Sequence, residues 1–117
     1  MLGLLKRSGN RLFEFVVPVT IGAATDVAVA DGAQSVVCYA AAPDEDKAKQ
    51  VAITHLHMRR CVTHAGWKVR VVDHSNWDQY ARTRWPRSAP TLPNKHQVST
   101  ILQQGGFFFG PANPNKG

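Results

Sequence analysis

The chain of 117 residues is 44% hydrophobic and carries a formal net charge of +6. Its length suffices for one domain with a single core, and its hydrophobic content excludes a wholly disordered chain. No apolar run approaches the roughly 18–20 residues that span a bilayer, so no membrane span is expected.

The positive charge is concentrated in the second half of the chain. Between Lys47 and Lys95 the only acidic residues in the sequence are Asp73 and Asp78. A basic surface of this kind suits a phosphate backbone or another polyanion. Solubility alone is the simpler explanation of the same charge.

Two features bear on the compartment in which the protein works. Cys38 and Cys61 have no Cys-x-x-Cys spacing and are interpreted as reduced core thiols, which favours an intracellular protein. Residues 1–11 carry basic and leucine side chains without an acid, which resembles an organellar targeting segment. An uncleaved basic N-terminal arm is the alternative.

Three short strands are predicted before any helix. Residues 12–19 are rich in Phe and Val and contain a proline, which is typical of an edge strand. Residues 25–30 alternate between valine and other side chains and lead into Asp31-Gly32, a strong hairpin signal. Residues 34–40 include an apolar run that suits a central strand buried on both faces.

A helix is predicted from Pro43 to about Ala65. Its first turn contains a proline followed by three acids, which complement the helix dipole. Gly66 is expected to end the helix in the left-handed conformation. The residues expected to face the sheet recur at helical spacing: Val51, His55, Met58, Val62 and Ala65.

The rest of the chain is predicted to hold one more strand and one more long helix. The strand covers residues 67–73 and is followed by a short helical turn through Tyr80. Residues 82–93 are interpreted as a loop rich in proline and arginine. The last helix covers residues 94–104 and ends at Gly105.

Three segments and one tryptophan form a pattern within this order of elements: Asp26-Val27-Ala28-Val29, Val36-Val37-Cys38-Tyr39, residues 58–72 and Trp77. The pattern resembles the RAP domain, an RNA-associated domain found mostly in organellar proteins. The resemblance implies an α/β, restriction-endonuclease-like fold, in which helices flank a small mixed sheet of three N-terminal strands and a fourth strand after a helix. It divides the chain into an N-terminal arm or targeting remnant (1–11), the domain (12–104) and an extended C-terminal tail (105–117).

The residues that a nuclease of this fold needs are incomplete. Such an enzyme holds Mg²⁺ with one carboxylate near the second strand and an acid-x-Lys pair on the third. Asp26 is a candidate for the first carboxylate, but residues 34–39 contain neither an acid nor a lysine. We therefore expect a non-catalytic protein without a cofactor, in which Asp26 is a structural residue. A degenerate or subunit-completed metal-dependent nuclease is the alternative.

A zinc site is the other chemistry that the sequence suggests. His57 and Cys61 stand one turn apart on the predicted helix, with His55 nearby. Because no fourth ligand is close in sequence, we expect no metal, with His55 facing the core and His57 the surface.

Binding residues are predicted where arginines and an indole interleave. Between Arg82 and Arg87 guanidinium groups surround Trp85, which suits phosphates and stacked unpaired bases. The alternative is that Trp85 fills the edge of the core, where Trp67 and Trp77 are also expected. The predicted RNA-binding residues are Arg59, Arg60, Lys68, Arg70, Arg82, Arg84, Trp85, Arg87 and Lys95.

Phe107, Phe108 and Phe109 are predicted to contact a partner. Consecutive side chains of an extended backbone point in different directions, so one core cannot cover all three. We expect the tail to leave the domain and to bury at least one phenylalanine in a neighbouring subunit or an RNA crevice. The alternative is that the tail folds back over the edge of the sheet.

Together these expectations describe a non-catalytic RNA-binding or structural component of an organellar ribonucleoprotein. The resemblance and the basic charge favour RNA, ribosomal RNA in particular, and the mitochondrial ribosome as the assembly. Neighbouring protein subunits in the mitochondrial matrix are the further partners expected. A structural subunit of another organellar protein complex is the remaining alternative.

Overall fold

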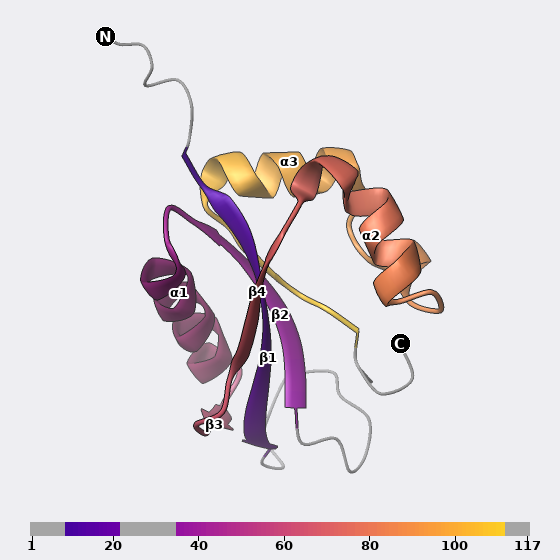
Figure 1. Ribbon diagram of the computed structural model, residues 1–117. Coiled ribbons are helices and arrows are strands. Elements are labelled where there is room, and N and C mark those ends of the chain that lie inside the picture. Colours follow the sequence, from indigo (N-terminus) through magenta and orange to yellow (C-terminus); the bar gives the residue numbers. More distant parts are fainter. Residues whose placement is uncertain (1–8, 22–34, 112–117) are drawn as a thin grey trace, which may run out of the picture.

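The structure is a computed structural model that describes residues 9–21 and 35–111 of the chain. Its elements, in chain order, are β1 (Arg11–Ile21), β2 (Ser35–Ala42), α1 (Glu45–Met58), β3 (Cys61–Thr63), β4 (Lys68–Val72), the 3-10 turn η2 (His74–Asn76), α2 (Trp77–Arg84), the 3-10 turn η3 (Ala89–Thr91), α3 (Lys95–Gln104) and β5 (Phe107–Phe109) (Figure 1). None of the helices in these residues has the length and apolar composition that crossing a membrane requires.

β1 is the centre of an open sheet of five strands. β2 pairs with one side of β1 along most of its length, and β5 pairs with the outer side of β2. On the other side of β1, β4 pairs with the first half of the strand and β3 with its end. All of these pairs are antiparallel, so the mixed sheet expected from the sequence is wrong for the described strands.

The proline in residues 12–19 predicted an edge strand, but β1, which contains it, is a central strand. The β4 pairing stops at Val16 and the β3 pairing starts at Val19, so Pro18 lies between the two partners. Its carbonyl accepts a hydrogen bond from the His64 backbone N–H at 2.9 Å. A residue without an N–H is tolerated in this central strand because it stands where one partner replaces another.

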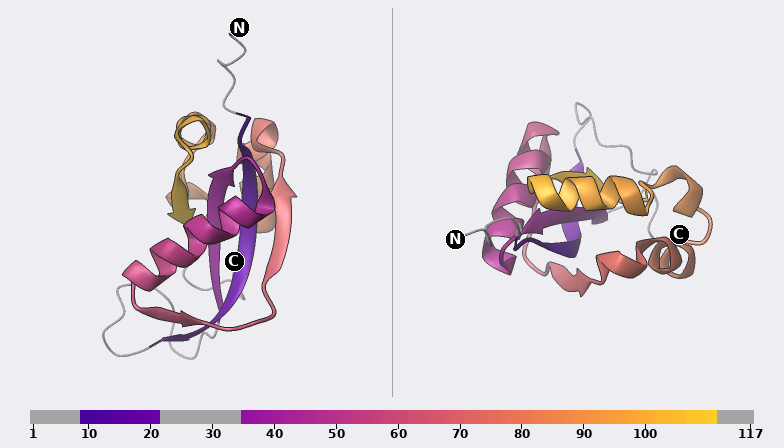
Figure 2. Two further views of the ribbon diagram at one scale, coloured as in Figure 1. Left: turned by 90° about the vertical axis from the view of Figure 1, so that its left-hand side faces the viewer. Right: turned by 90° about the horizontal axis from the view of Figure 1, so that it is seen from above.

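Helices cover both faces of the sheet, α1 on one face and α2 with α3 on the other (Figures 1 and 2). Alternate residues of β1 therefore enter two cores: Phe13 and Phe15 lie on the α1 side, and Leu12 lies on the α2–α3 side. β2 is buried on both faces, as its apolar run predicts. On the α2–α3 side the core contains Trp77 and Trp85.

α1 is shorter than its predicted length, and only part of its predicted sheet-facing stripe packs against the sheet. It ends at Met58. Two residues later Arg60 adopts a positive φ of 63°, and β3 begins at Cys61. Its buried residues are Ala48, Ala52 and Leu56. Of the predicted stripe, Val51 packs against this core and His55 stacks on Phe107, whereas Met58 is 67% exposed. Small side chains let a helix backbone approach a sheet closely, so two alanines lie at the centre of the helix–sheet contact.

Of the two predicted glycine stops, one is confirmed. Gly105 ends α3 with a left-handed φ of 72°. Gly66 has a φ of 96°, but it lies in the loop between β3 and β4 and ends no helix. At the other end of α3, Asn94 and Gln97 form a capping box, in which each side chain accepts the other residue's backbone N–H.

The three phenylalanines are a strand of the sheet, so the tail does not leave the domain at Gly105 as expected. Phe107 and Phe109 pack against the α1-side core, and Phe108 packs against the α2–α3-side core. Their side chains do point in opposite directions, but both directions meet a core because helices cover both faces. The alternative, a tail folded over the sheet edge, is what β5 shows.

Three further sequence-based predictions have different outcomes. The predicted strand at 25–30, with Asp26 and the Asp31-Gly32 turn, lies outside the described residues. α2 continues to Arg84, beyond the predicted turn, and so takes in the first part of the predicted loop. Trp77 is fully buried and Trp67 packs half-buried against Phe15, as expected of core residues.

Candidate nucleic-acid interface

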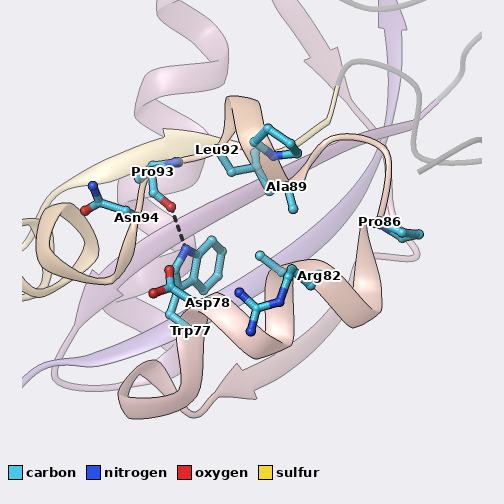
Figure 3. A pocket seen from close by; sticks show the side chains of 10 residues that line it. Trp77, Asp78, Arg82, Pro86, Ala89, Leu92, Pro93 and Asn94 are labelled. Atoms are coloured by element: carbon cyan, nitrogen blue, oxygen red, sulfur yellow. Dashed lines mark hydrogen bonds between the residues drawn. The ribbon is translucent and has the colours of Figure 1, made fainter.

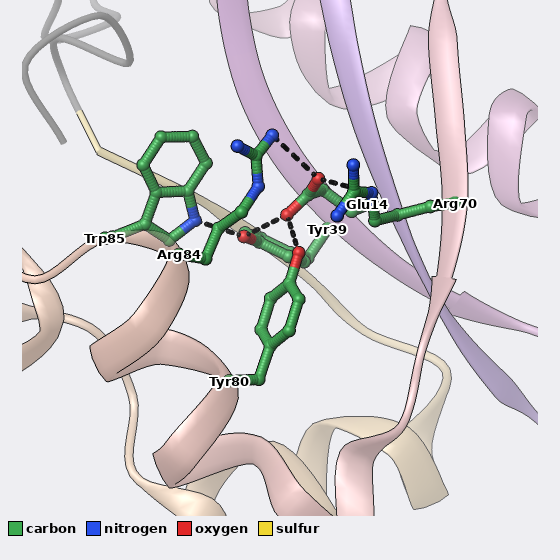
Figure 4. Close-up of polar contacts among 6 residues, drawn as sticks. All are labelled: Glu14, Tyr39, Arg70, Tyr80, Arg84 and Trp85. Carbon is green, nitrogen blue, oxygen red and sulfur yellow. Dashed lines mark hydrogen bonds and ion pairs between the residues drawn. The ribbon is translucent and has the colours of Figure 1, made fainter.

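One buried carboxylate organises the surface between β4 and α2. Glu14 is 1% exposed and points from β1 toward α2. Its Oε2 accepts a hydrogen bond from the Tyr39 hydroxyl at 2.7 Å and another from the Tyr80 hydroxyl. Its Oε1 accepts from Arg84 Nη2 at 3.3 Å and lies 3.6 Å from Arg70 Nε (Figure 4). We refer to Glu14, Tyr39, Arg70, Tyr80, Arg84 and Trp85 as the Glu14 cluster.

The sheet and one helix bring these residues together. Tyr39 on β2 and Arg70 on β4 are the direct cross-strand neighbours of Glu14, so the three form one row across the sheet. Tyr80 and Arg84 are four residues apart on α2 and therefore project from the same side of that helix. The cluster thus connects three strands to the helix above them.

Both tyrosines act as hydrogen-bond donors to Glu14. Burial, followed by the negative charge of Glu14, raises the pKa of Tyr39. Burial and the hydrogen bond to Glu14 raise the pKa of Tyr80 to about 12. The two hydroxyls therefore keep their protons at neutral pH. For Arg84, burial disfavours the charged form, but the nearby Glu14 carboxylate outweighs it and raises the pKa.

In this arrangement Glu14 is inaccessible to a ligand, whereas the two arginine side chains are partly exposed. Both carboxylate oxygens are occupied by donors, so Glu14 presents no free oxygen at the surface. The side chain of Arg70 is 56% exposed and that of Arg84 is 31% exposed. One negative charge thus fixes two guanidinium groups, and a positive charge remains in excess.

Lys68 extends this charged surface along β4. It is exposed and lies two residues from Arg70 on the same strand, so both project to the α2 side of the sheet. We refer to Lys68, Arg70 and Arg84 as the anchored basic face. The three were predicted to bind RNA; Arg70 and Arg84 meet at Glu14, and Lys68 projects to the same side of the sheet.

Trp85 is not the base-stacking residue that the sequence predicted. Its side chain is 2% exposed, and its indole N–H donates to the Tyr39 hydroxyl oxygen at 2.8 Å. The Arg84 guanidinium covers the ring, 4.2 Å from its centroid. The alternative prediction, a tryptophan that fills the edge of the core, is confirmed.

The other predicted RNA-binding residues lie elsewhere on the molecule. Arg59 and Arg60 are exposed at the end of α1, with Arg59 5.7 Å from the Phe109 ring centroid. Arg82 and Arg87 are exposed on and after α2. Lys95 is exposed at the start of α3. The structure therefore divides the predicted set among several surfaces.

The candidate zinc ligands do not converge. His55 stacks on Phe107 with the ring centroids 4.3 Å apart, His57 is exposed, and Cys61 is buried. Within residues 9–21 and 35–111, no three His, Cys, Asp or Glu side chains are placed to hold a metal ion.

The sequence reasoning missed Glu14, Tyr39 and Tyr80. A usable signal was present, because Glu14 is the one charged residue between Leu12 and Val19 in an otherwise apolar strand. A charge in the middle of such a strand predicts a buried partner network. Its partners come from distant positions and could not be named from the sequence.

Comparisons of the chain with protein-family models, with curated proteins and with solved structures found no match.

Proposed function

We propose that the protein is a non-catalytic RNA-binding component of an organellar ribonucleoprotein, the mitochondrial ribosome first, and that RNA phosphates contact the anchored basic face. The resemblance to the RAP domain and to restriction-endonuclease-like folds, the basic charge and the targeting-like N-terminus support this assignment. Ribosomal RNA and neighbouring subunits are the partners it implies.

The observation that carries the proposal is the fixation of Arg70 and Arg84 by one buried carboxylate. A long basic side chain normally loses rotamer freedom when it binds a phosphate. Here a hydrogen bond from Arg84 and an ion pair from Arg70 to Glu14 already restrain the guanidinium groups, so less entropy is lost on binding. Arginine also offers its remaining N–H donors to phosphate oxygens in a planar arrangement.

The same geometry argues for binding rather than catalysis. A catalytic carboxylate must reach substrate, metal or water, and Glu14 is closed on both oxygens and shielded by α2. Its role in this proposal is to position the arginines.

The test is RNA affinity as a function of salt concentration. We would measure binding of a mixed-sequence single-stranded RNA to the Lys68→Gln/Arg70→Gln variant. Each lost phosphate contact lowers the slope of log K against log salt by roughly 0.7, so the double variant should lose about 1.4. Lys47→Gln/Lys49→Gln is the matched control, because it removes the same charge from α1 on the opposite face. Equal slopes for the two double variants would contradict the proposal.

A second candidate is a structural subunit of another organellar protein complex. The observation in its favour is a set of exposed apolar side chains: Met58, Val62, Val69 and Val71. The last two lie on β4, whose outer edge has no strand partner among the described residues. If the native protein sediments with a large particle and stays there after ribonuclease treatment, this candidate replaces the first.

A further inference from the structure

A pocket outside the Glu14 cluster lies between α2, the η3 turn and the start of α3 (Figure 3). Its volume is about 350 Å³. That is at the lower end of the range for small-molecule sites, roughly 300–1,000 Å³, and fits a ligand no larger than one nucleotide.

The walls of the pocket are mainly apolar. Pro86, Pro90 and Leu92 line it on the side of the η3 turn, and Ala81 lines it from α2. The buried Trp77 also borders the pocket, but its indole N–H is already donated to the Pro93 carbonyl oxygen at 2.6 Å. These walls offer rigid, apolar contact to a flat ring and no competing donor from the tryptophan.

Two charged side chains of α2 supply the polar part of the pocket. The exposed Arg82 guanidinium makes no ion pair or hydrogen bond with any residue that the structure describes. This distinguishes Arg82 from Arg70 and Arg84, which bind Glu14. Asp78 accepts the Lys95 backbone N–H on Oδ1 at 3.0 Å, and Oδ2 remains available as an acceptor.

We propose that this pocket binds one unpaired nucleotide, with its base between the proline and leucine walls and its phosphate on Arg82. The apolar walls suit a base, the guanidinium suits a phosphate, and the carboxylate suits a base that presents N–H donors. Guanine presents two adjacent donors on its Watson–Crick edge, so a guanine nucleotide is expected to bind most tightly.

This inference rests on the proposed RNA-binding function but uses different residues. Arg84 in the anchored basic face and Arg82 at the pocket both belong to α2. An RNA strand held by the anchored basic face would find a base-sized pocket on the same helix. The pocket would give this otherwise sequence-independent contact a preference for one base.

The test is a titration of the full chain with guanosine 5′-monophosphate, uridine 5′-monophosphate and inorganic phosphate. The indole N–H signal of Trp77 in a ¹H–¹⁵N spectrum is the reporter, because Trp77 lines the pocket and this N–H is bonded to the carbonyl of Pro93, another lining residue. We expect the guanosine nucleotide to shift this signal at the lowest concentration. Arg82→Gln should weaken its binding about tenfold, and Asp78→Asn should bring the two nucleotides to similar affinity. Arg87→Gln is the matched control, since Arg87 is exposed and does not line the pocket.

Three outcomes would overturn the inference: no shift with either nucleotide, an equal shift with inorganic phosphate alone, or equal losses in Arg82→Gln and Arg87→Gln. The two proposals fail separately. If the Lys68→Gln/Arg70→Gln variant lowers the salt slope and nucleotides still do not bind, the RNA-binding function stands and the pocket assignment is wrong. If nucleotides bind and the slope is unchanged, the anchored basic face is wrong and the pocket stands.

Discussion

Trp85 donates its indole N–H to the hydroxyl oxygen of Tyr39, and the same hydroxyl donates its proton to Glu14. This chain of two hydrogen bonds connects the end of α2 to the middle of β1 through β2. The position of α2, and with it Arg84 of the anchored basic face, therefore depends on groups that are buried in the sheet.

Replacing Trp85 by Phe is expected to lower the free energy of unfolding by about 1–3 kcal/mol. The substitution removes one donor to a buried hydroxyl and leaves a small cavity. Urea unfolding followed by circular dichroism measures the change. Trp67→Phe is the control, because Trp67 is half-buried and its described contacts are ring contacts. A larger loss in Trp67→Phe would contradict the importance of the Trp85 hydrogen bond.

Glu14→Gln is expected to destabilise the fold more than any exposed charge change. The loss should be on the order of 1–3 kcal/mol, because the buried hydrogen bonds weaken while water around the partly exposed arginines compensates part of the lost counter-charge. Glu45→Gln, in the exposed first turn of α1, should cost only a few tenths of a kcal/mol. Thermal unfolding of both variants makes the comparison. Similar midpoints would contradict the stabilising role of the Glu14 cluster.

Alkaline pH should destabilise the protein through Cys38 and Tyr80. Burial raises the Cys38 pKa from 9.0 to about 12, and burial with the Glu14 hydrogen bond raises the Tyr80 pKa from 10.0 to about 12. Above the unfolded values, the unfolded chain has lost these protons while the folded chain keeps them. The free energy of unfolding therefore falls as pH rises from about 9 to about 12. Tyr80→Phe and Cys38→Ala should each flatten this fall, as measured by urea midpoints across that pH range.

A chain that ends after Gln104 is expected to unfold. It lacks β5, and with it the packing of Phe108 on Tyr39, whose ring centroids are 4.8 Å apart, and of Phe107 on His55. Phe108→Ala in the full chain should cost roughly 2–4 kcal/mol. A cooperative thermal transition of the truncated chain near that of the full chain would show that β5 is dispensable.

The parts of the fold that sequence predicted well are specified locally. The last helix was predicted over residues 94–104 with its stop at Gly105, and α3 covers Lys95–Gln104 and ends at Gly105, because its end depends on residues close together in the chain. β2 was also placed well, because its apolar run has one interpretation in a sheet covered on both sides.

The errors arose where distant segments decide the structure. The residues after Met58 continue a helical pattern, but Cys61–Thr63 pairs with the end of β1 instead. The Phe strand was misjudged because its pairing with β2, more than 60 residues earlier in the chain, is not visible in the local sequence. The Glu14 cluster was missed for the same reason, since Glu14 and Arg84 are 70 residues apart in the chain.

The central place of β1 has a consequence for how the protein forms. β1 comes first in the described chain, and all of its strand partners are synthesised later. β4 lies in the second half of the chain. During synthesis its phenylalanines and valines emerge from the ribosome well before the strand and helices that will cover them. Such high contact order predicts refolding in milliseconds to seconds rather than microseconds. The nascent chain thus passes through a stage in which the apolar β1 segment, including Glu14, is exposed to solvent. A chaperone would act at that stage.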